Sequence, residues 1–525
     1  MVIASRKSFP FAGRLEGLRA GLAKALDTVN TNRPLRRWIL TLIILAAVLL
    51  RALVAWLHPL MLPDSFDYET LARQILRGGP YEVTGMLAKR MPGYPVFLAG
   101  IYALFGVRPL AALLAQAGLG GILVGVVYAM GRRLSPAVGV VAAALVAVDP
   151  LLIGFAAALL SETVFTVVFT LALWLLLELL QSPGHLRRWM LVGVSFLAGV
   201  YIRAEVVLCL VPLAAWVAAT GVRPGIRIRG STSARGDGHS APAPSTGRAQ
   251  NEKTRREDTK DDRKKPGTTS GSGNSEWTVG GAEMRRCGEG TSPGGQRNGK
   301  TQNGERWPAA RPWLGAGVAL LIVGAGLMPW WIRNYQLFGQ DFFRFTTLQG
   351  ISLYEAVYSG ATGGPRQTHI ALPAAWRGFN ESQRDLAWTR RAWRAIRRHP
   401  GRMLWLAAVK IARTWSPWLH ARGFARPAVN VPLTIWYILI YILCIVGLVQ
   451  GGVPWRFAGV GLLSLLYFTM MHALFLGSVR YRVPVMPLVL LGAAVGACRL
   501  AGHPRFGAAA GTQAPVRAGP PHPGR

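Results

Sequence analysis

The chain has 525 residues, of which 51% are hydrophobic and only 16% are charged. That balance excludes an ordinary soluble protein of this length and is typical of a bundle of lipid-facing helices. The formal net charge is +35. Because the basic residues lie mostly at the ends of apolar runs and in loops, they indicate attraction to anionic lipid, and no nucleic-acid partner is expected. The four cysteines have no paired spacing, so neither a disulfide framework nor a zinc site is indicated.

Apolar runs near the length needed to cross a bilayer recur along the chain and predict an all-α polytopic membrane protein with about ten transmembrane helices. A helical fold is expected because lipid offers no partner for open strand edges. The predicted spans are residues 38–57, 109–130, 136–155, 157–180, 189–202, 206–220, 313–332, 431–449, 457–476 and 483–500.

Residues 1–37 form a basic segment that is too long for the first region of a cleavable signal peptide. The short loops carry arginines, such as Arg132 and Arg187, that fall on the same side as this segment. Lys and Arg in short loops favour the cytoplasmic side. We therefore expect both termini in the cytoplasm and two long loops, residues 58–108 and 333–430, outside.

Residues 222–312 differ from the rest of the chain. They are rich in Gly, Ser, Thr, Lys and Arg and lack aliphatic runs, so they predict a disordered cytoplasmic linker. This linker separates an N-terminal membrane module, residues 38–221, from a C-terminal one, residues 313–500. The Gly-, Pro- and Ala-rich tail, residues 501–525, is also predicted to be disordered.

The two outer loops contain predicted elements of their own. In the first, residues 67–76 fit an interfacial amphipathic helix, and residues 95–105 are apolar but too short to span. In the second, residues 381–398 predict a charged helix and residues 403–415 an amphipathic one. A pore or an anchor has little need of such elements, which favours a site at the outer surface.

Two carboxylates, Asp64 and Asp67, follow the first predicted span at the level of the lipid head groups. A carboxylate there could deprotonate an incoming hydroxyl, or hold a metal ion that does so. The alternative is structural, because Asp is favoured at a helix N-terminus and the pair could cap the helix that follows. One can cap while the other reacts.

Cations occur at two outer positions. Lys89 and Arg90 precede a rigid Pro-Gly-Tyr-Pro turn, and Arg480 and Arg482 open the last predicted span. Lys and Arg side chains positioned by such a turn or helix start can bind a phosphate. The alternative is that they are interfacial anchors whose charges reach the lipid head groups.

Glu162 and Asp149 lie near the outer ends of the fourth and third predicted spans. Ionisable groups within a span are costly and usually functional, although both are close enough to a helix end to reach the interface.

Tyr354 lies beside a Gly-rich stretch that suits sugar or acceptor contact, or is an ordinary loop. No GxxxxGK[ST], HExxH or GxGxxG motif occurs in the sequence, so nucleotide hydrolysis and soluble-type nucleotide-sugar binding are unsupported.

Six phrases in order resemble the bacterial dolichyl-phosphate-mannose:protein mannosyltransferase-like superfamily of GT-C glycosyltransferases. This group includes the lipid A aminoarabinose transferases and the rhizobial lipopolysaccharide glycosyltransferases. The resemblance extends over residues 36–220 and 313–500. The matching phrases are residues 64–72, 90–99, 160–165, 329–339, 399–417 and 480–487.

The resemblance implies a catalytic carboxylate in the first outer loop, where Asp64 stands. Ser65 occupies the position at which members often carry a second acid, and Asp67 lies one helical turn after Asp64. Glu162 matches a recurring acid. The expected catalytic residues are Asp64, Asp67 and Glu162, the expected donor-phosphate ligands are Lys89, Arg90, Arg480 and Arg482, and the expected substrate contacts are Tyr68, Tyr94, Tyr354 and Tyr481.

The implied protein is a glycosyltransferase of the bacterial plasma membrane. An acceptor on a protein, lipid or polysaccharide attacks the anomeric carbon of a polyprenyl-phosphate sugar, with Asp64 as general base and arginines stabilising the leaving phosphate. The resemblance leaves a divalent cation open and does not specify the acceptor. The main alternative is a lipid or solute transporter, which predicts inverted repeats and broken helices at mid-membrane. A structural membrane protein is the third class.

Overall fold

The computed structural model describes residues 10–221, 311–341, 343–365, 370–420 and 426–502. The regular elements within these ranges are helices, joined by turns and by isolated bridges such as the one between Leu60 and Ala158. The predicted all-α membrane fold is confirmed. The two membrane modules form one compact unit, whereas the expected linker lies outside the described residues, except that Arg311 and Pro312 begin a helix.

Seven helices of the described residues are long and apolar enough to cross a membrane, and an eighth span results if one bent pair is counted. Their lengths follow from the thickness of the hydrocarbon core. They are α2 (Arg33–Leu57), α5 (Pro109–Gly131), α8 (Glu162–Leu179), α11 (Arg311–Phe338), α15 (Pro427–Gln450), α16 (Trp455–Leu474) and the run Val479–Leu500, made of η5 (Val479–Val485) and α17 (Met486–Leu500).

The predicted count of about ten spans is higher than the eight that the structure supports at full length. The third predicted span is the bent pair, α6 (Pro136–Val148) and α7 (Pro150–Ala156), which meet at 54°. The fourth begins at Glu162 rather than at residue 157. The fifth and sixth lie on shorter elements, because a turn interrupts the apolar sequence. These elements are α9 (Leu186–Ile202), η1 (Ala204–Cys209) and α10 (Leu210–Thr220).

The bend between α6 and α7 is stabilised by two charged side chains. Asp149 accepts a hydrogen bond from the backbone N–H of Leu152 at 3.0 Å and so caps α7. Arg51 is buried in α2 and donates to the carbonyl oxygens of Val146 and Ala147 at 2.7 and 2.9 Å. Because helix ends leave backbone groups without intrahelical partners, these bonds let a helix break inside an apolar bundle.

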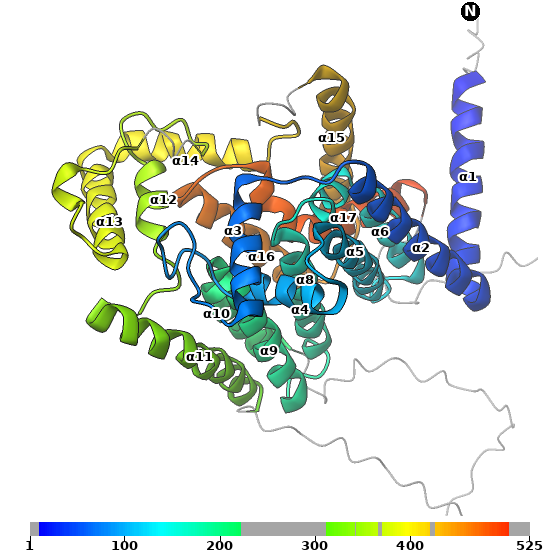
Figure 1. Cartoon of the computed structure of the whole chain (residues 1–525). Helices are drawn as coiled ribbons and strands as arrows, with labels where there is room; N and C mark the ends of the chain where they lie inside the picture. The colour runs from blue at the N-terminus through cyan, green and yellow to red at the C-terminus, as the bar shows by residue number, and fades with distance from the viewer. Residues whose placement is uncertain (1–9, 222–310, 342, 366–369, 421–425, 503–525) are drawn as a thin grey trace, which may run out of the picture. The chain divides into compact units, whose positions relative to one another are not determined.

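Glycines allow the closest helix contacts. A Cβ atom at Gly447 of α15 would lie 2.1 Å from the carbonyl oxygen of Gly492 on α17. A Cβ atom at Gly193 of α9 would lie 2.9 Å from the carbonyl oxygen of Ala319, and α9 and α11 lie side by side in Figure 1. In membranes, small residues at such crossings permit the backbone contact that drives helix association.

The shorter helices carry or support the charged residues described next. Residues 67–76 and 95–105 lie within α3 and α4, in the loop of residues 58–108. Residues 381–398 form α13 as expected, and most of 403–415 lies on α14. The remaining bounds are α1 (Pro10–Thr31), α3 (Pro63–Arg77), α4 (Gly93–Phe105), η2 (Gly339–Asp341), α12 (Gln349–Glu355), η4 (Ala374–Trp376), α13 (Glu381–Arg398) and α14 (Pro400–Thr414).

Candidate active site

Eight charged side chains from both membrane modules form a continuous series of ion pairs in which cation and carboxylate alternate. We call this series the ion chain. It contains four cations and four carboxylates, so its formal charge is zero. In order, its members are Lys89, Asp67, Arg90, Asp64, Arg480, Glu162, Arg203 and Glu205.

The first part of the ion chain joins α3 to the loop that follows it. Lys89 Nζ lies 2.8 Å from Asp67 Oδ1, and Arg90 Nη2 lies 2.9 Å from Asp67 Oδ2. The same Arg90 nitrogen lies 2.5 Å from Asp64 Oδ1. The side chain at the start of α3 that bonds to the backbone is Ser65, whose Oγ accepts from Leu62 N–H at 3.0 Å. The carboxylates of Asp64 and Asp67 thus bind Lys and Arg side chains, which argues against the capping alternative.

Arg480 continues the ion chain from the last helical run. Its Nη1 lies 2.6 Å from Asp64 Oδ2, and its Nε donates to Glu162 Oε1. Asp64 thus binds Arg90 through one carboxylate oxygen and Arg480 through the other. Because Arg90 comes from the first outer loop and Arg480 from the C-terminal module, Asp64 joins the two modules.

Glu162, at the first residue of α8, is fully buried. Arg203 Nη1 lies 2.8 Å from Glu162 Oε1, and Arg203 Nε lies 2.8 Å from Glu205 Oε1. The second oxygen of Glu162 has no hydrogen-bond partner among the described residues. Arg203 and Glu205 lie in the gap between the predicted spans 189–202 and 206–220 and were not among the expected site residues. The signal that could have identified them is an acid–base pair between two short apolar segments, since such pairs mark functional sites in membranes.

The two arginines determine the protonation of Asp64. Burial raises the pKa of this carboxyl, but the charges and hydrogen bonds of Arg90 and Arg480 outweigh burial and lower the pKa to about 2. Asp64 is therefore ionised at neutral pH. A base with so low a pKa accepts protons weakly for as long as both arginines stay on it.

Two of the four candidate tyrosines border the ion chain directly. Arg90 Cζ lies 5.4 Å from the centroid of the Tyr68 ring, and Arg203 Cζ lies 5.9 Å from that of Tyr481. Tyr94 is fully buried behind Tyr68, with ring centroids 4.8 Å apart. The Tyr354 ring stacks on that of Trp388, and Tyr354 packs against the same small apolar cluster as Tyr481.

Arg482 and Asp149 are not part of the ion chain. Arg482 is almost fully buried, with its guanidinium carbon 4.4 Å from the centroid of Tyr437. The Tyr437 hydroxyl lies 3.1 Å from Asp149 Oδ2, and Trp436 Nε1 lies 3.2 Å from the same oxygen. The structure therefore separates Arg482 from Arg480, although only one residue lies between them, and directs Arg482 into the protein interior.

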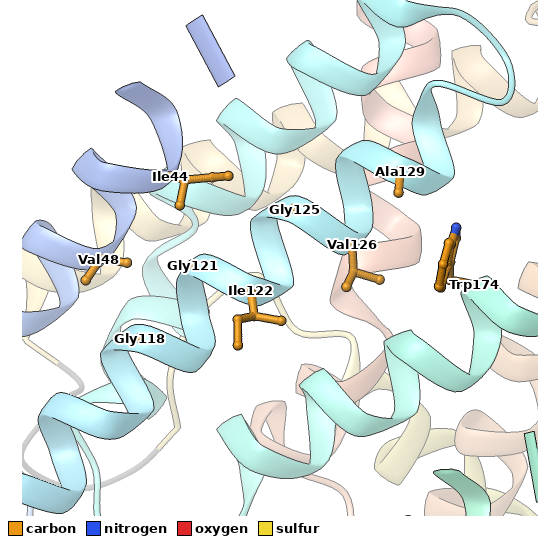
Figure 2. Close-up of a pocket in the computed structure, with 9 residues that line it drawn as sticks. All are labelled: Ile44, Val48, Gly118, Gly121, Ile122, Gly125, Val126, Ala129 and Trp174. Carbon is orange, nitrogen blue, oxygen red and sulfur yellow. The ribbon is translucent and has the colours of Figure 1, made fainter. Parts of the chain in front are cut away.

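A groove of about 450 Å³ lies between α2, α5 and α8 (Figure 2). Gly118 and Gly125 of α5 form part of its floor, and Ile44 and Trp174 border it on the neighbouring helices. Trp174 lies about 18 Å along α8 from Glu162 by helical rise. The lining is almost wholly apolar, so this groove suits a hydrocarbon chain and not a sugar.

The carboxylates of the ion chain do not form a metal centre as they stand. Within the part of the chain that the structure describes, no group of three His, Cys, Asp or Glu side chains could hold a metal ion. Each of the four carboxylates already binds Lys or Arg. A divalent cation would have to displace these partners, and we derive no step through one.

One family model matches part of the chain. The model of a family described as dolichyl-phosphate-mannose-protein mannosyltransferase matches residues 89–230. That range contains Lys89, Arg90, Glu162, Arg203 and Glu205, more than half of the ion chain. The search of curated proteins returned no match.

An all-helical membrane fold, a largely half-buried series of ion pairs and this family match over part of the chain support a membrane glycosyltransferase. More specifically, the match over residues 89–230 supports a glycosyltransferase of the mannosyltransferase type, within the GT-C superfamily that the sequence phrases resemble.

Proposed function

We propose that the protein transfers a sugar from a polyprenyl-phosphate donor to an acceptor at the outer face of the bacterial plasma membrane, with Asp64 as general base. The observation that carries this proposal is the placement of Asp64 between Arg90 and Arg480. One potential base and two potential phosphate ligands thus lie within a single set of contacts. Both termini, and the linker of residues 222–312, are proposed to be cytoplasmic.

Arg90 and Arg480 suit the phosphate of the donor. A guanidinium group presents parallel N–H donors that match the spacing of phosphate oxygens. In the structure these donors bind carboxylates, so the ion chain is neutral without donor. An incoming phosphodiester adds a negative charge that competes with Asp64 and Asp67 for the arginines. Lys89, bound to Asp67 and Thr84, is the neighbouring cation that can keep Asp67 neutralised.

The competition for arginine couples donor binding to activation of the base. As Arg90 and Arg480 move to the phosphate, the pKa of Asp64 rises from about 2 toward its ordinary range. Asp64 then takes the proton from the acceptor hydroxyl or amine. The acceptor atom forms a bond to the anomeric carbon as the bond from that carbon to the phosphate oxygen breaks. The lipid phosphate leaves with the electron pair, stabilised by the same arginines.

The remaining members of the ion chain orient Arg480. Glu162 accepts hydrogen bonds from both Arg480 and Arg203. It therefore orients the Arg480 guanidinium group toward Asp64. Tyr68 and Tyr481 are proposed to border the sugar, since aromatic rings present flat apolar surface with a polar edge. Tyr94 is proposed to support Tyr68 through their edge contact.

The apolar groove beside α2 supports a donor with a lipid tail. Its floor and walls offer surface to an isoprenoid chain inside the hydrocarbon layer (Figure 2). A donor whose tail stays in the bilayer brings its phosphate to the membrane surface, which is where the first outer loop is proposed to lie. Protein, lipid and polysaccharide acceptors are all compatible with these contacts.

A transporter is a second candidate because the bent pair α6–α7 resembles the broken helices of transporters. In such proteins the helix ends at the break line a substrate cavity. Here Asp149 at the break is fully buried and bound to Trp436 and Tyr437. This packing favours a structural role for the break and leaves the glycosyltransferase as the better-supported function.

The test is sugar transfer by the purified protein in lipid, with a panel of polyprenyl-phosphate sugars and candidate acceptors. Asp64→Asn should lower transfer by at least about 100-fold, the usual contribution of a general base. Glu69→Gln is the matched control. It lies on the same helix, and its half-buried carboxylate pairs with Arg73, outside the ion chain, so transfer should stay near wild type. Equal transfer by wild type and Asp64→Asn would exclude Asp64 as the base.

A further inference from the structure

The segment from Tyr81 to Arg90 carries two cations of the ion chain, and residues of the C-terminal module hold its backbone. Within the segment, the Tyr81 hydroxyl donates to the carbonyl oxygen of Arg90 at 3.1 Å. No regular helix or strand fixes these residues. Reciprocal backbone bonds between Val83 and Met86 close a turn within the segment, whereas Leu87 and Ala88, after that turn, are bonded to other parts of the molecule.

Arg333, near the end of α11, holds the carbonyl groups of this segment. Its Nη2 donates to the carbonyl oxygen of Leu87 at 2.8 Å and to that of Tyr81 at 3.3 Å. Its guanidinium carbon lies 4.8 Å from the centroid of the Trp330 ring. A planar cation stacked on an aromatic ring loses little freedom when it donates, so Arg333 is a rigid contact.

Glu381, the first residue of α13, binds backbone amide groups of the 81–90 segment. Its carboxylate accepts from Leu87 N–H at 3.0 and 3.1 Å and from Ala88 N–H at 3.1 Å. The helix does not need this carboxylate as a cap, because Asn380 and Gln383 already form a capping box. Burial raises the pKa of Glu381, whereas the two amides are among the groups that oppose the rise.

Further contacts hold the backbone around Ala88. Thr347 N–H donates to the carbonyl oxygen of Ala88 at 3.0 Å. Ala88 and Met91 are buried against Trp330 in a small apolar cluster. The backbone immediately before Lys89 and Arg90 is thus bonded on both its amide and its carbonyl groups, and backed by apolar side chains.

We propose that Glu381 and Arg333 are positioning residues that set where Lys89 and Arg90 meet the donor phosphate. The second outer loop then governs donor binding, in addition to any contact that it makes with the acceptor. This inference rests on the proposed function for its link to the donor. Its structural part, the restraint of Leu87 and Ala88 by Glu381, stands independently of catalysis.

The experiment compares Glu381→Ala and Glu381→Gln with wild type in lipid nanodiscs. The first measurement is the Kd for a polyprenyl monophosphate that carries no sugar. The second is amide hydrogen exchange of a peptide that contains Leu87 and Ala88. Glu381→Ala should weaken binding by about tenfold, the effect of losing a hydrogen bond to a charged group, and should speed exchange. Glu381→Gln keeps one oxygen acceptor, so its effects should be smaller.

Asp385→Asn is the matched control. Asp385 lies one turn further along α13, where it accepts from Gly350 N–H and binds Arg344, neither of which belongs to the 81–90 segment. This variant should loosen α12 against α13 while phosphate-lipid binding stays near wild type. An equal loss of binding in Asp385→Asn and Glu381→Ala would overturn the inference, because general loosening would then explain both.

Transfer kinetics separate positioning from misfolding. With an active wild type, Glu381→Ala should raise the KM for donor and leave kcat nearly unchanged, whereas partial unfolding would lower kcat alone and overturn the inference. If the wild type transfers no sugar, the proposed function fails. The exchange data still test whether Glu381 restrains Leu87 and Ala88. Unchanged exchange at Leu87 and Ala88 in Glu381→Ala would overturn it.

Discussion

Asp64 and Asp67 lie one turn apart on α3 but differ in what they connect. Asp67 binds Lys89 and Arg90, which are neighbours in one loop. Asp64 binds Arg90 and Arg480, which come from different modules. Only a donor phosphate that draws both of these arginines away would release both oxygens of Asp64. This difference favours Asp64 over Asp67 as the base.

The pKa of Asp64 leads to a prediction for the acidic limits of transfer. In the donor-free protein the pKa is lowered to about 2, so the base form persists down to that pH. If the arginines move to the phosphate, the pKa rises, and in the donor complex the base form is lost at a higher pH. The acidic limb of kcat, which reports the complex, should therefore lie above that of kcat/KM, which reports the free enzyme.

Both parameters can be measured between about pH 3 and pH 7 with a phosphodiester donor, whose own ionised state is constant there. We expect kcat/KM to stay level on the acidic side while kcat falls. Asp64→Glu is a useful comparison because it keeps a carboxylate on a longer side chain. Coincident limbs for kcat and kcat/KM in the wild type would contradict the movement of the arginines.

At the scale of single elements, η5 directs two arginines to different parts of the protein. Arg480 binds Asp64 in the ion chain, and Arg482 lies over Tyr437 in the interior. Ser478 begins this short helix, with its Oγ accepting from Arg480 N–H at 3.4 Å. Burial of Arg482 fixes the rotation of η5 about its axis, and so contributes to the direction of Arg480. The resemblance alone did not distinguish these two roles.

The groove between α2, α5 and α8 leads to a prediction for a substitution on the face of α5 that lines it. A Cβ atom at Gly118 would meet no heavy atom within 4 Å, so Gly118→Leu adds side-chain volume there without a backbone clash. If the donor tail lies in this groove, the variant should raise the KM for long-chain donors by about tenfold, since each displaced methylene loses roughly 0.8 kcal/mol of burial. Short-chain donors should be unaffected.

The measurement is the KM for donors of two or more isoprenoid lengths. Gly317→Leu on α11 is the control, because Gly317 also lies on a spanning helix and its added Cβ would likewise meet no heavy atom within 4 Å. A rise in KM that is equal for short and long donors would show that the groove does not hold the tail.

At the scale of the whole molecule, the ion chain crosses between the two membrane modules, and it contains no residue of the segment between them. The described residues within Met1–Pro224 and Arg306–Arg525 form one compact unit. We therefore predict that the two pieces, coexpressed as separate chains without residues 225–305, assemble and transfer sugar at a rate within about threefold of the intact protein, since packing rather than chain continuity holds them.

Copurification of the two pieces and transfer by the complex would be measured together. The same pieces carrying Asp64→Asn should copurify and remain inactive, which separates assembly from catalysis. Failure of the pieces to associate would indicate that the segment between them is needed for assembly.

The sequence alone determined the class of fold, because hydropathy is a local property of consecutive residues. Runs of apolar residues in α2, α5 and α15 predicted these helices closely, and the charged pattern of residues 381–398 predicted α13. The hydropathy of consecutive residues did not predict the helix break at Asp149. The break depends on hydrogen bonds from Arg51, which is distant in the sequence.

The candidate site was predicted in part. Asp64, Arg90, Glu162 and Arg480 were each singled out, but their contacts could not be derived, since Arg480 and Asp64 are 416 residues apart in the sequence. Which charges pair is decided by tertiary packing: helices bury whole faces together, and each buried charge must then find the nearest opposite charge. For the same reason only the tertiary structure brought Arg203 and Glu205 into the ion chain and directed Arg482 elsewhere.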